Sequence, residues 1–151
     1  MDNLDEKYMS RALELAQLAF EKNEVPIGCV IVHGAEIIGE GYNLRNTAGN
    51  TLHHAEILAI DQACKRLKDW RLDDCTMYVT LEPCPMCAGA ILQARLPRLV
   101  FGAKNPKAGA VGSLINLLDD DRFNHKTNIE QGVLEADCAA LIKKFFASLR
   151  L

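Results

Sequence analysis

The stretch Thr76-Met77-Tyr78-Val79-Thr80-Leu81-Glu82-Pro83-Cys84-Pro85-Met86-Cys87 decides how the chain folds and where its chemistry lies. Its first six residues are rich in strand-forming side chains, and the run from Cys87 to Ala94 is rich in Ala, Leu and Ile without further proline. Pro83 and Pro85 therefore mark a strand-to-helix junction. Cys84 and Cys87 then fall on the first turn of a helix, where residues three apart share a face and both sulfurs can reach one ion.

An upstream histidine completes the set of metal ligands. His54 opens a second apolar helical run, so we expect a site where two helix N-termini meet over a sheet. The free N–H groups and the positive dipole end of the cysteine helix favour thiolate, the form that binds metal. Structural zinc normally has four protein ligands, whereas catalytic zinc keeps three and leaves the fourth position to water. His54, Cys84 and Cys87 therefore predict a catalytic site with one Zn²⁺ per chain.

Glu56 lies two residues after His54 and is the candidate catalytic residue. Water on such a zinc ion has a pKa of about 7, and a nearby carboxylate can carry its proton to a ring nitrogen and then to a leaving amine. Assistance of this kind is worth on the order of 10²- to 10⁴-fold in rate. A lone Cys-x-x-Cys can also be a structural half-site or a redox pair. With His-x-Glu upstream and Pro83 before the first cysteine, the pattern is the signature of zinc-dependent nucleobase deaminases.

The chain from Glu24 to Phe146 resembles the bacterial tRNA-specific adenosine deaminases, a zinc-dependent family similar to the cytidine and deoxycytidylate deaminases. The resemblance rests on several segments: Glu24-Val25-Pro26-Ile27-Gly28, Gly39-Glu40-Gly41-Tyr42-Asn43, His54-Ala55-Glu56, Trp70-Arg71-Leu72, Tyr78 to Cys84, Met86 to Ala90, Gly112-Ser113-Leu114, Phe123-Asn124-His125 and Cys138 to Phe146. It implies a three-layer α/β/α cytidine-deaminase-like fold with a central mixed sheet of about five strands. It also implies zinc-hydroxide deamination of the wobble adenosine in a tRNA anticodon stem-loop, and a homodimer.

Further residues carry roles by this resemblance. Asn43 is similar to the asparagine that hydrogen-bonds the flipped base, although it could simply end a hairpin. Ile27 and Leu81 would form apolar walls of the substrate pocket, and core packing would explain them equally well. Glu82 would support the motif, or be an exposed strand end. Relatives usually carry aspartate where this chain has Asn105, which predicts weaker discrimination against DNA; the alternative is that asparagine starts a turn before the following proline.

The charge distribution indicates where RNA would lie. Residues 1 to 90 hold 8 Lys and Arg against 14 Asp and Glu, whereas residues 91 to 151 hold 9 against 6. The basic half could follow a phosphate backbone. Its candidates are Lys104, Lys107, Lys143, Lys144 and Arg150, with Phe145 and Phe146 as stacking surfaces for unpaired bases. A basic amphipathic terminal helix is also typical of a solvated face over a core stripe.

Length and composition predict a single domain, residues 1–151, in the cytoplasm, and the resemblance implies that it is a zinc-dependent deaminase domain. No run of 18 apolar residues suggests a membrane span, and the start is acidic where a signal peptide would be basic. Cys29, Cys64, Cys75 and Cys138 lie in apolar patterns, and we expect small buried side chains there rather than disulfides; a redox role is the alternative.

Apolar periodicity predicts strands that alternate with helices, and hence an α/β layered sheet. The expected elements are a helix over residues 3–22, a hairpin of Ile27–Val32 and Glu36–Gly41, a helix from His54, strands at Thr76–Leu81, Leu99–Phe101 and Thr127–Gly132, a short helix at Leu114–Leu118 and a terminal helix.

Two other functions use the same motifs. A free-nucleobase deaminase acting on guanine or cytosine is the first, and a zinc-stabilised RNA-binding subunit without activity is the second. Phe123-Asn124-His125 and Phe145-Phe146 favour the tRNA enzyme over the first. An intact Glu56 argues against the second, because a purely structural site has no use for a proton shuttle.

Overall fold

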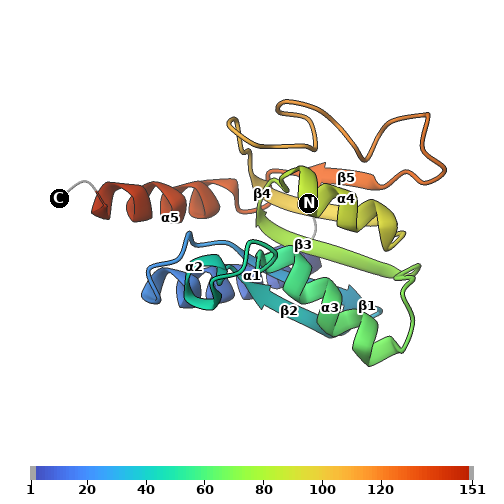
Figure 1. The fold of residues 1–151 in the computed structure, drawn as a ribbon, viewed down its shortest axis with the longest axis horizontal. Helices are drawn as coiled ribbons and strands as arrows, with labels where there is room; N and C mark the ends of the chain where they lie inside the picture. Colours follow the sequence, from blue (N-terminus) through green and yellow to red (C-terminus); the bar gives the residue numbers. More distant parts are fainter. Residues whose placement is uncertain (1–2, 150–151) are drawn as a thin grey trace.

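The structure, a computed structural model, describes residues 3–149. Its elements are, in chain order, α1 (Asn3–Glu21), β1 (Gly28–His33), β2 (Glu36–Tyr42), α2 (Arg45–Ala48), α3 (Ala55–Leu67), β3 (Cys75–Leu81), α4 (Pro85–Gln93), β4 (Arg98–Ala103), β5 (Asn128–Gln131) and α5 (Glu135–Ser148). Figure 1 shows them around one sheet, with α5 extending past the sheet edge. Arg150, a candidate RNA contact, lies outside the described residues. Within residues 3–149, every helix is too short or too polar for a membrane span.

The five strands form one mixed sheet in the order β2-β1-β3-β4-β5. β1 pairs antiparallel with β2 and β3, whereas β4 pairs parallel with β3 and β5. Parallel strands end at the same edge of a sheet, and Leu81 of β3 lies opposite Ala103 of β4. The segments that follow these two strands therefore leave the sheet side by side.

Two cores cover the two faces of the sheet. Cys29 and Ile31 of β1 face one core, which includes side chains of α3 and α4. Val30 and Val32 face the other, which includes side chains of α1 and α5. Alternate residues of a strand point to opposite faces, so a strand buried on both sides is apolar throughout. This is the three-layer α/β/α arrangement with a mixed sheet that the family resemblance implies.

Glycine on β2 sets how closely α3 approaches the sheet. A Cβ atom on Gly41 would lie 2.3 Å from the carbonyl oxygen of Ala55, the first residue of α3. Only glycine allows two backbones to come this close. Because His54 immediately precedes α3, this close contact also sets the position of the predicted metal ligand relative to the sheet.

The predicted short helix at Leu114–Leu118 is wrong. Residues 104–127 form turns and an isolated β-bridge between Val111 and Asn116. The Asn116 Oδ1 atom accepts the Leu118 N–H at 3.2 Å, a local bond that competes with helix formation. Leu118 is fully buried and Leu114 is 62% exposed, so these leucines anchor a loop instead of lining a helix face. The four-residue helix α2 was not predicted.

The remaining predicted elements are present, with boundaries shifted by one or two residues. Cys29, Cys75 and Cys138 are buried as expected, whereas Cys64 is only partly buried. All six thiols are free of disulfides.

Candidate metal centre and substrate cavity

His54 is placed by the start of α3. It precedes the helix with extended dihedral angles, φ −83° and ψ 152°, and its carbonyl oxygen accepts the Leu58 N–H at 3.1 Å. This is the geometry of an N-cap residue, which leaves the imidazole free to project from the helix end. The preceding residue, His53, is half-buried, with its carbonyl accepting the Leu44 N–H and its Nδ1 atom buried without a hydrogen-bond partner in the part of the chain that is described.

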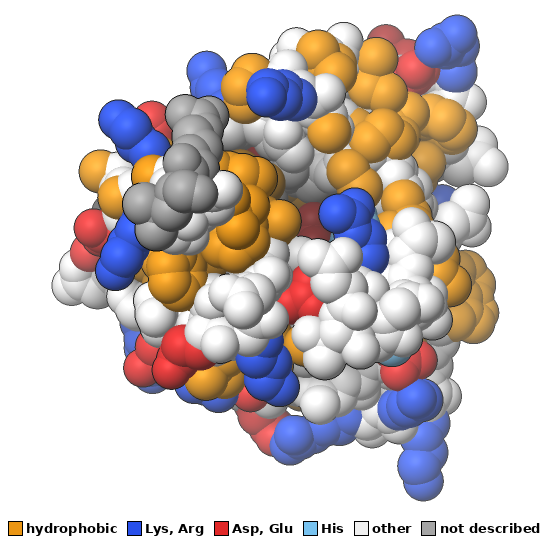
Figure 2. All heavy atoms as spheres, turned by 60° about the vertical axis from the view of Figure 1, so that its left-hand side comes forward, with side chains coloured by type: hydrophobic (Ala, Val, Ile, Leu, Met, Phe, Trp, Pro, Cys, Tyr) orange, Lys and Arg blue, Asp and Glu red, His pale blue; other side chains and the backbone are white. Residues whose placement is uncertain are grey.

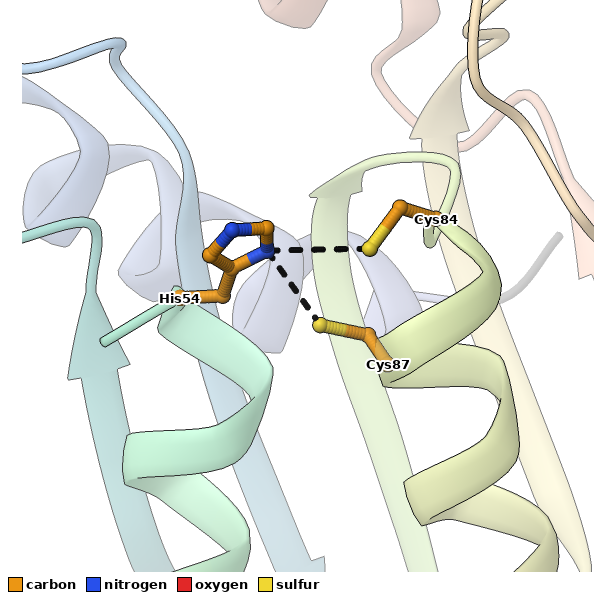
Figure 3. A group of neighbouring side chains, drawn as sticks. All are labelled: His54, Cys84 and Cys87. Atoms are coloured by element: carbon orange, nitrogen blue, oxygen red, sulfur yellow. Dashed lines mark hydrogen bonds between the residues drawn. The ribbon is translucent and has the colours of Figure 1, made fainter. Parts of the chain in front are cut away.

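The two cysteines lie at the start of α4. Cys84 is the N-cap residue, Pro85 occupies the first helical position, where its missing N–H costs no bond, and Cys87 follows on the same face. The His54 Nδ1 atom lies 3.7 Å from Cys84 Sγ and 3.5 Å from Cys87 Sγ. All three ligand atoms lie within 4.8 Å of one another. Figure 3 shows the imidazole of α3 pointing at both sulfurs across the gap between the two helices.

These separations fit a tetrahedral metal ion. An ion about 2.3 Å from each sulfur and about 2.0 Å from the nitrogen would hold nitrogen and sulfur about 3.5 Å apart. The donor set of one imidazole and two thiols is also one that zinc prefers. His54, Cys84 and Cys87 could therefore hold a metal with little rearrangement.

The side chains of His54, Cys84 and Cys87 shift one another's pKa values. Hydrogen bonding from Cys87 lowers the pKa of Cys84 to about 4, and an interaction with His54 acts in the same direction. The bond to Cys84 and burial raise the pKa of Cys87. Hydrogen bonding to Cys84 raises the pKa of His54. One thiolate thus forms readily at neutral pH, and a bound dication would displace the remaining proton.

Glu56 lies beside this group, in the first turn of α3. It is only 4% exposed, and burial raises the pKa of its carboxyl to about 7. The nearby Cys84 charge adds to this shift. Among the described residues, the ligand cluster comprises the histidine and two cysteines and does not include Glu56. Its position therefore fits a carboxylate that moves protons next to a metal.

A cavity of about 450 Å³ opens onto His54. The structure places all six predicted substrate-binding residues in its wall: Ile27, Asn43, Leu81, Asn105, Lys107 and Phe146. It adds residues to which the sequence assigned no role, namely Val25, Arg45, Ala55, Pro106 and Ile142, together with Lys104, which was predicted to contact RNA. Figure 2 shows the face towards which α5 projects: hydrophobic side chains gather around a hollow, and basic side chains lie near its edge.

Hydrogen bonds between side chains and backbone groups stabilise the part of the cavity wall that contains Asn43 and Arg45. The Asn43 Oδ1 atom accepts the Arg45 N–H at 3.2 Å, and its Nδ2 atom donates to the Val25 carbonyl at 3.4 Å. Glu24 is fully buried and accepts the N–H groups of Asn46 and Thr47. Arg45 could have been suspected from its place two residues after Asn43.

The opposite wall comes from the segment after β4. The Asn105 Oδ1 atom accepts the Ala108 N–H at 3.2 Å, so this side chain does start a turn, while it also lines the cavity. Lys104 and Lys107 are exposed. The position of Asn105 is therefore compatible with both interpretations of the sequence, the start of a turn and a contact to the bound nucleic acid.

The two adjacent phenylalanines of α5 differ in accessibility. Phe145 is 5% exposed and makes an edge-to-face contact with Phe20, with ring centroids 5.9 Å apart. It cannot stack on a base, so that expectation was wrong. Phe146 is 44% exposed and lines the cavity. Lys143 and Lys144 are exposed, and the Lys144 ammonium lies over the Phe20 ring.

Comparison with known proteins agrees with this site. The family of MafB19-like deaminases matches residues 3–150. The tRNA-specific adenosine deaminase of Bacillus subtilis (strain 168) is 52% identical over 146 residues, 97% of this chain and 91% of that protein. A structure solved in work on A-to-I editing by tRNA:A34 deaminases at the wobble position of transfer RNA has a TM-score of 0.86 and 39% identity, covering 89% of this chain and 98% of that one.

A solved guanine deaminase from Nitrosomonas europaea is similar in fold only, with a TM-score of 0.78 and 22% identity over 94% of this chain and 84% of that one. The chain belongs to the MafB19-like deaminase family and to the tRNA-specific adenosine deaminases.

Proposed function

We propose that this protein deaminates the wobble adenosine of a tRNA anticodon loop to inosine, with water as co-substrate and ammonia as the second product. One observation carries the proposal: the His54–Cys84–Cys87 group lies beside a buried carboxylate and opens onto a cavity with a basic and aromatic rim. The family of the chain, and the identity to the Bacillus subtilis enzyme, support the same substrate.

The cavity is suited to a base that has left its stack. Its volume of about 450 Å³ lies in the range typical of small-ligand pockets. Ile27 and Leu81 would contact the faces of the base. Asn43 uses one acceptor and one donor position for the backbone, and its amide retains a second of each for the edge of the base.

We propose zinc, one ion per chain, at His54, Cys84 and Cys87. When bound, it would supply a Lewis acid that lowers the pKa of water to about 7. Glu56 would take one proton from that water and deliver it to the ring nitrogen next to the reacting carbon. It would then take the second proton from the oxygen that has been added to this carbon and give it to the amine, which leaves as ammonia. A carboxyl with a pKa of about 7 can both accept and donate protons near neutral pH.

The decisive experiment supplies the purified protein with an RNA anticodon stem-loop that contains a wobble adenosine. Free adenosine, guanine and cytosine are tested in parallel. We expect inosine and an equal amount of ammonia from the stem-loop, and far slower turnover of the free compounds. Faster deamination of guanine or cytosine would support the free-base alternative instead.

The rim favours RNA over a free base. Arg45, Lys104 and Lys107 lie around the cavity, and a free base carries no phosphate for them to contact. A zinc-stabilised RNA-binding subunit without activity would not need a buried carboxylate beside the metal-ligand group, so the position of Glu56 argues against this alternative.

We also propose that the chain is one catalytic domain that works as a cytoplasmic homodimer. The resemblance described in the sequence analysis implies the dimer, and several large apolar side chains are exposed on the described surface: Leu52, Trp70, Leu114 and Ile115. Sedimentation equilibrium at micromolar concentration tests this, and a monomer mass there would contradict it.

A further inference from the structure

Glu82 is a buried carboxylate that lies between the metal-binding turn and the wall of the cavity. It follows β3 directly, precedes Pro83 and Cys84, and is 2% exposed. It is therefore not the exposed strand end that was one interpretation of the sequence. Burying a carboxylate is costly unless hydrogen bonds satisfy it.

Four hydrogen bonds from one loop satisfy Glu82. Its Oε1 atom accepts the Asn105 N–H at 3.1 Å and the Ser113 hydroxyl, and its Oε2 atom accepts the N–H groups of Val111 and Ser113, both at 3.0 Å. The donors come from both ends of residues 105–113. The carboxylate thus closes this segment into a loop around itself.

Packing and backbone bonds make the same connection. A Cβ atom on Gly109 would lie 2.3 Å from Glu82 Oε2, so glycine is needed for the loop to enclose the carboxylate. The Ala110 N–H donates to the Pro83 carbonyl at 2.8 Å. The loop is thereby attached to the two residues that immediately precede Cys84.

The near end of this loop is the basic wall of the cavity. Asn105 and Lys107 line it, and the Asn105 N–H is one of the four donors to Glu82. An ionised carboxylate only accepts hydrogen bonds, whereas an amide of the same shape replaces one acceptor oxygen with a donor NH₂ group. The NH₂ group of a glutamine would face the N–H groups of Val111 and Ser113 in one orientation and the N–H group of Asn105 in the other.

We propose that Glu82 is a positioning residue for RNA binding. It holds the cavity wall formed by Asn105 and Lys107 at a fixed position relative to the turn that contains Cys84. The inference rests on the proposed function, because it assigns this wall to the nucleotides that flank the reacting adenosine. Glu82 itself does not line the cavity on that side, so it acts through the loop.

The test compares Glu82→Gln with Asp5→Asn, a matched control. Asp5 is also 2% exposed and hydrogen-bonded by several groups, but it contacts Tyr78 and Arg98 and lines no part of the cavity. We expect Glu82→Gln to raise KM for the stem-loop about tenfold, with kcat within about threefold of wild type. The reason is that the loop wall binds the substrate and the transition state equally, so its loss weakens binding without slowing the chemical step. Asp5→Asn should lower Tm without raising KM. A KM that is unchanged in Glu82→Gln, or raised equally in both variants, overturns the proposal.

Two further measurements keep the outcome clear. Ser113→Ala removes one donor and leaves the carboxylate in place, so KM should rise about threefold even if Glu82→Gln does not fold. Hydrogen exchange of the Asn105, Val111 and Ser113 amides should accelerate in Glu82→Gln and not in Asp5→Asn, and equal exchange rates would contradict the positioning role. Wild-type turnover of the stem-loop tests the proposed function separately, since the exchange measurement does not depend on activity.

Discussion

Glu56 combines deep burial with a place beside the metal-ligand group, and the two together define its chemistry. Burial raises its pKa to about 7, where a carboxyl transfers protons most effectively at neutral pH. The ligand group itself needs no help from Glu56 to reach a three-ligand geometry. Metal binding and the proton transfer that we propose for Glu56 should therefore be separable in this site.

Replacing Glu56 with alanine should keep about one zinc per chain and lower kcat by on the order of 10²- to 10⁴-fold. Cys87→Ala should lose both metal and stability, because metal binding is coupled to folding. Elemental analysis of the two purified variants, alongside stem-loop turnover, checks both expectations. Equal loss of zinc from the two would show that Glu56 is a ligand.

Phe146 and Lys107 should act on RNA and not on the chemical step. The double variant Phe146→Ala with Lys107→Ala should weaken stem-loop binding, since base stacking is worth about 1–3 kcal/mol and one phosphate contact contributes about one unit of salt slope. Activity measured over a range of salt concentrations gives both quantities. Lys65→Ala, which changes an exposed lysine of α3 outside the cavity wall, is the control. Unchanged activity and salt slope in the double variant would favour a free-base substrate.

Individual site residues differ in how far the sequence alone could place them. His54, Cys84 and Cys87 were predictable because ligand spacing on helix starts is a local property. Phe145 and Phe146 are adjacent and chemically identical, so only the packing of α5 against Phe20 shows which one is accessible. Glu82 could not be assigned because its four donors come from a loop more than twenty positions away in the chain.

The contact between β2 and α3 gives a prediction for a whole element. Gly41→Ala would place a methyl group against the backbone of Ala55, which must move with the first turn of α3. We expect a loss of about 1–3 kcal/mol in the free energy of unfolding, and a lower kcat because His54 and Glu56 move too.

Gly89→Ala is the matched control, because a Cβ atom at this position of α4 meets no atom within 4 Å. It should be neutral or stabilising by up to about 1 kcal/mol. Urea unfolding of both variants decides the point, and similar stabilities would show that the β2–α3 contact is not limiting.

Elements with strong periodicity were predictable, and the exceptions depend on contacts outside their own segments. α1, α3, α4 and the four longer strands follow from apolar spacing and the prolines at the α4 start. Residues 114–118 have helix-like composition, but the Val111–Asn116 bridge and the anchoring of Leu118 in the core determine their path. α2 has four residues and depends on the distant Glu24, which accepts two of its N–H groups.

A partly buried ionic network connects α1 with β3, β4 and β5. Asp5 of α1 accepts hydrogen bonds from Tyr78 of β3 at 2.7 Å and from Arg98 of β4 at 2.8 Å, and Arg98 also bonds Glu130 of β5 at 2.7 Å. The bond from Arg98 lowers the pKa of Asp5 from 3.8 to about 2. A carboxyl with a lowered pKa stabilises the fold above its unfolded pKa and loses that contribution as the pH falls through its folded pKa.

Wild type should therefore exceed Asp5→Asn in stability by about 2 kcal/mol at neutral pH, the value of this pKa difference. The gap should narrow below pH 4 and nearly vanish at pH 2. Chemical denaturation of both proteins between pH 7 and pH 2 measures it. A gap that stays constant over this range would mean that ionisation of Asp5 contributes nothing.

Because α5 is the last helix of the chain, the residues that it contributes to the cavity wall are synthesised after the metal ligands. Translation runs from the N-terminus, so His54, Cys84 and Cys87 are synthesised well before Ile142 and Phe146 of α5, which complete the cavity wall. A nascent chain that has gained its metal ligands still lacks this part of the surface for RNA. An unfinished copy of the protein is thus poorly equipped to modify the tRNAs that are decoding its own message.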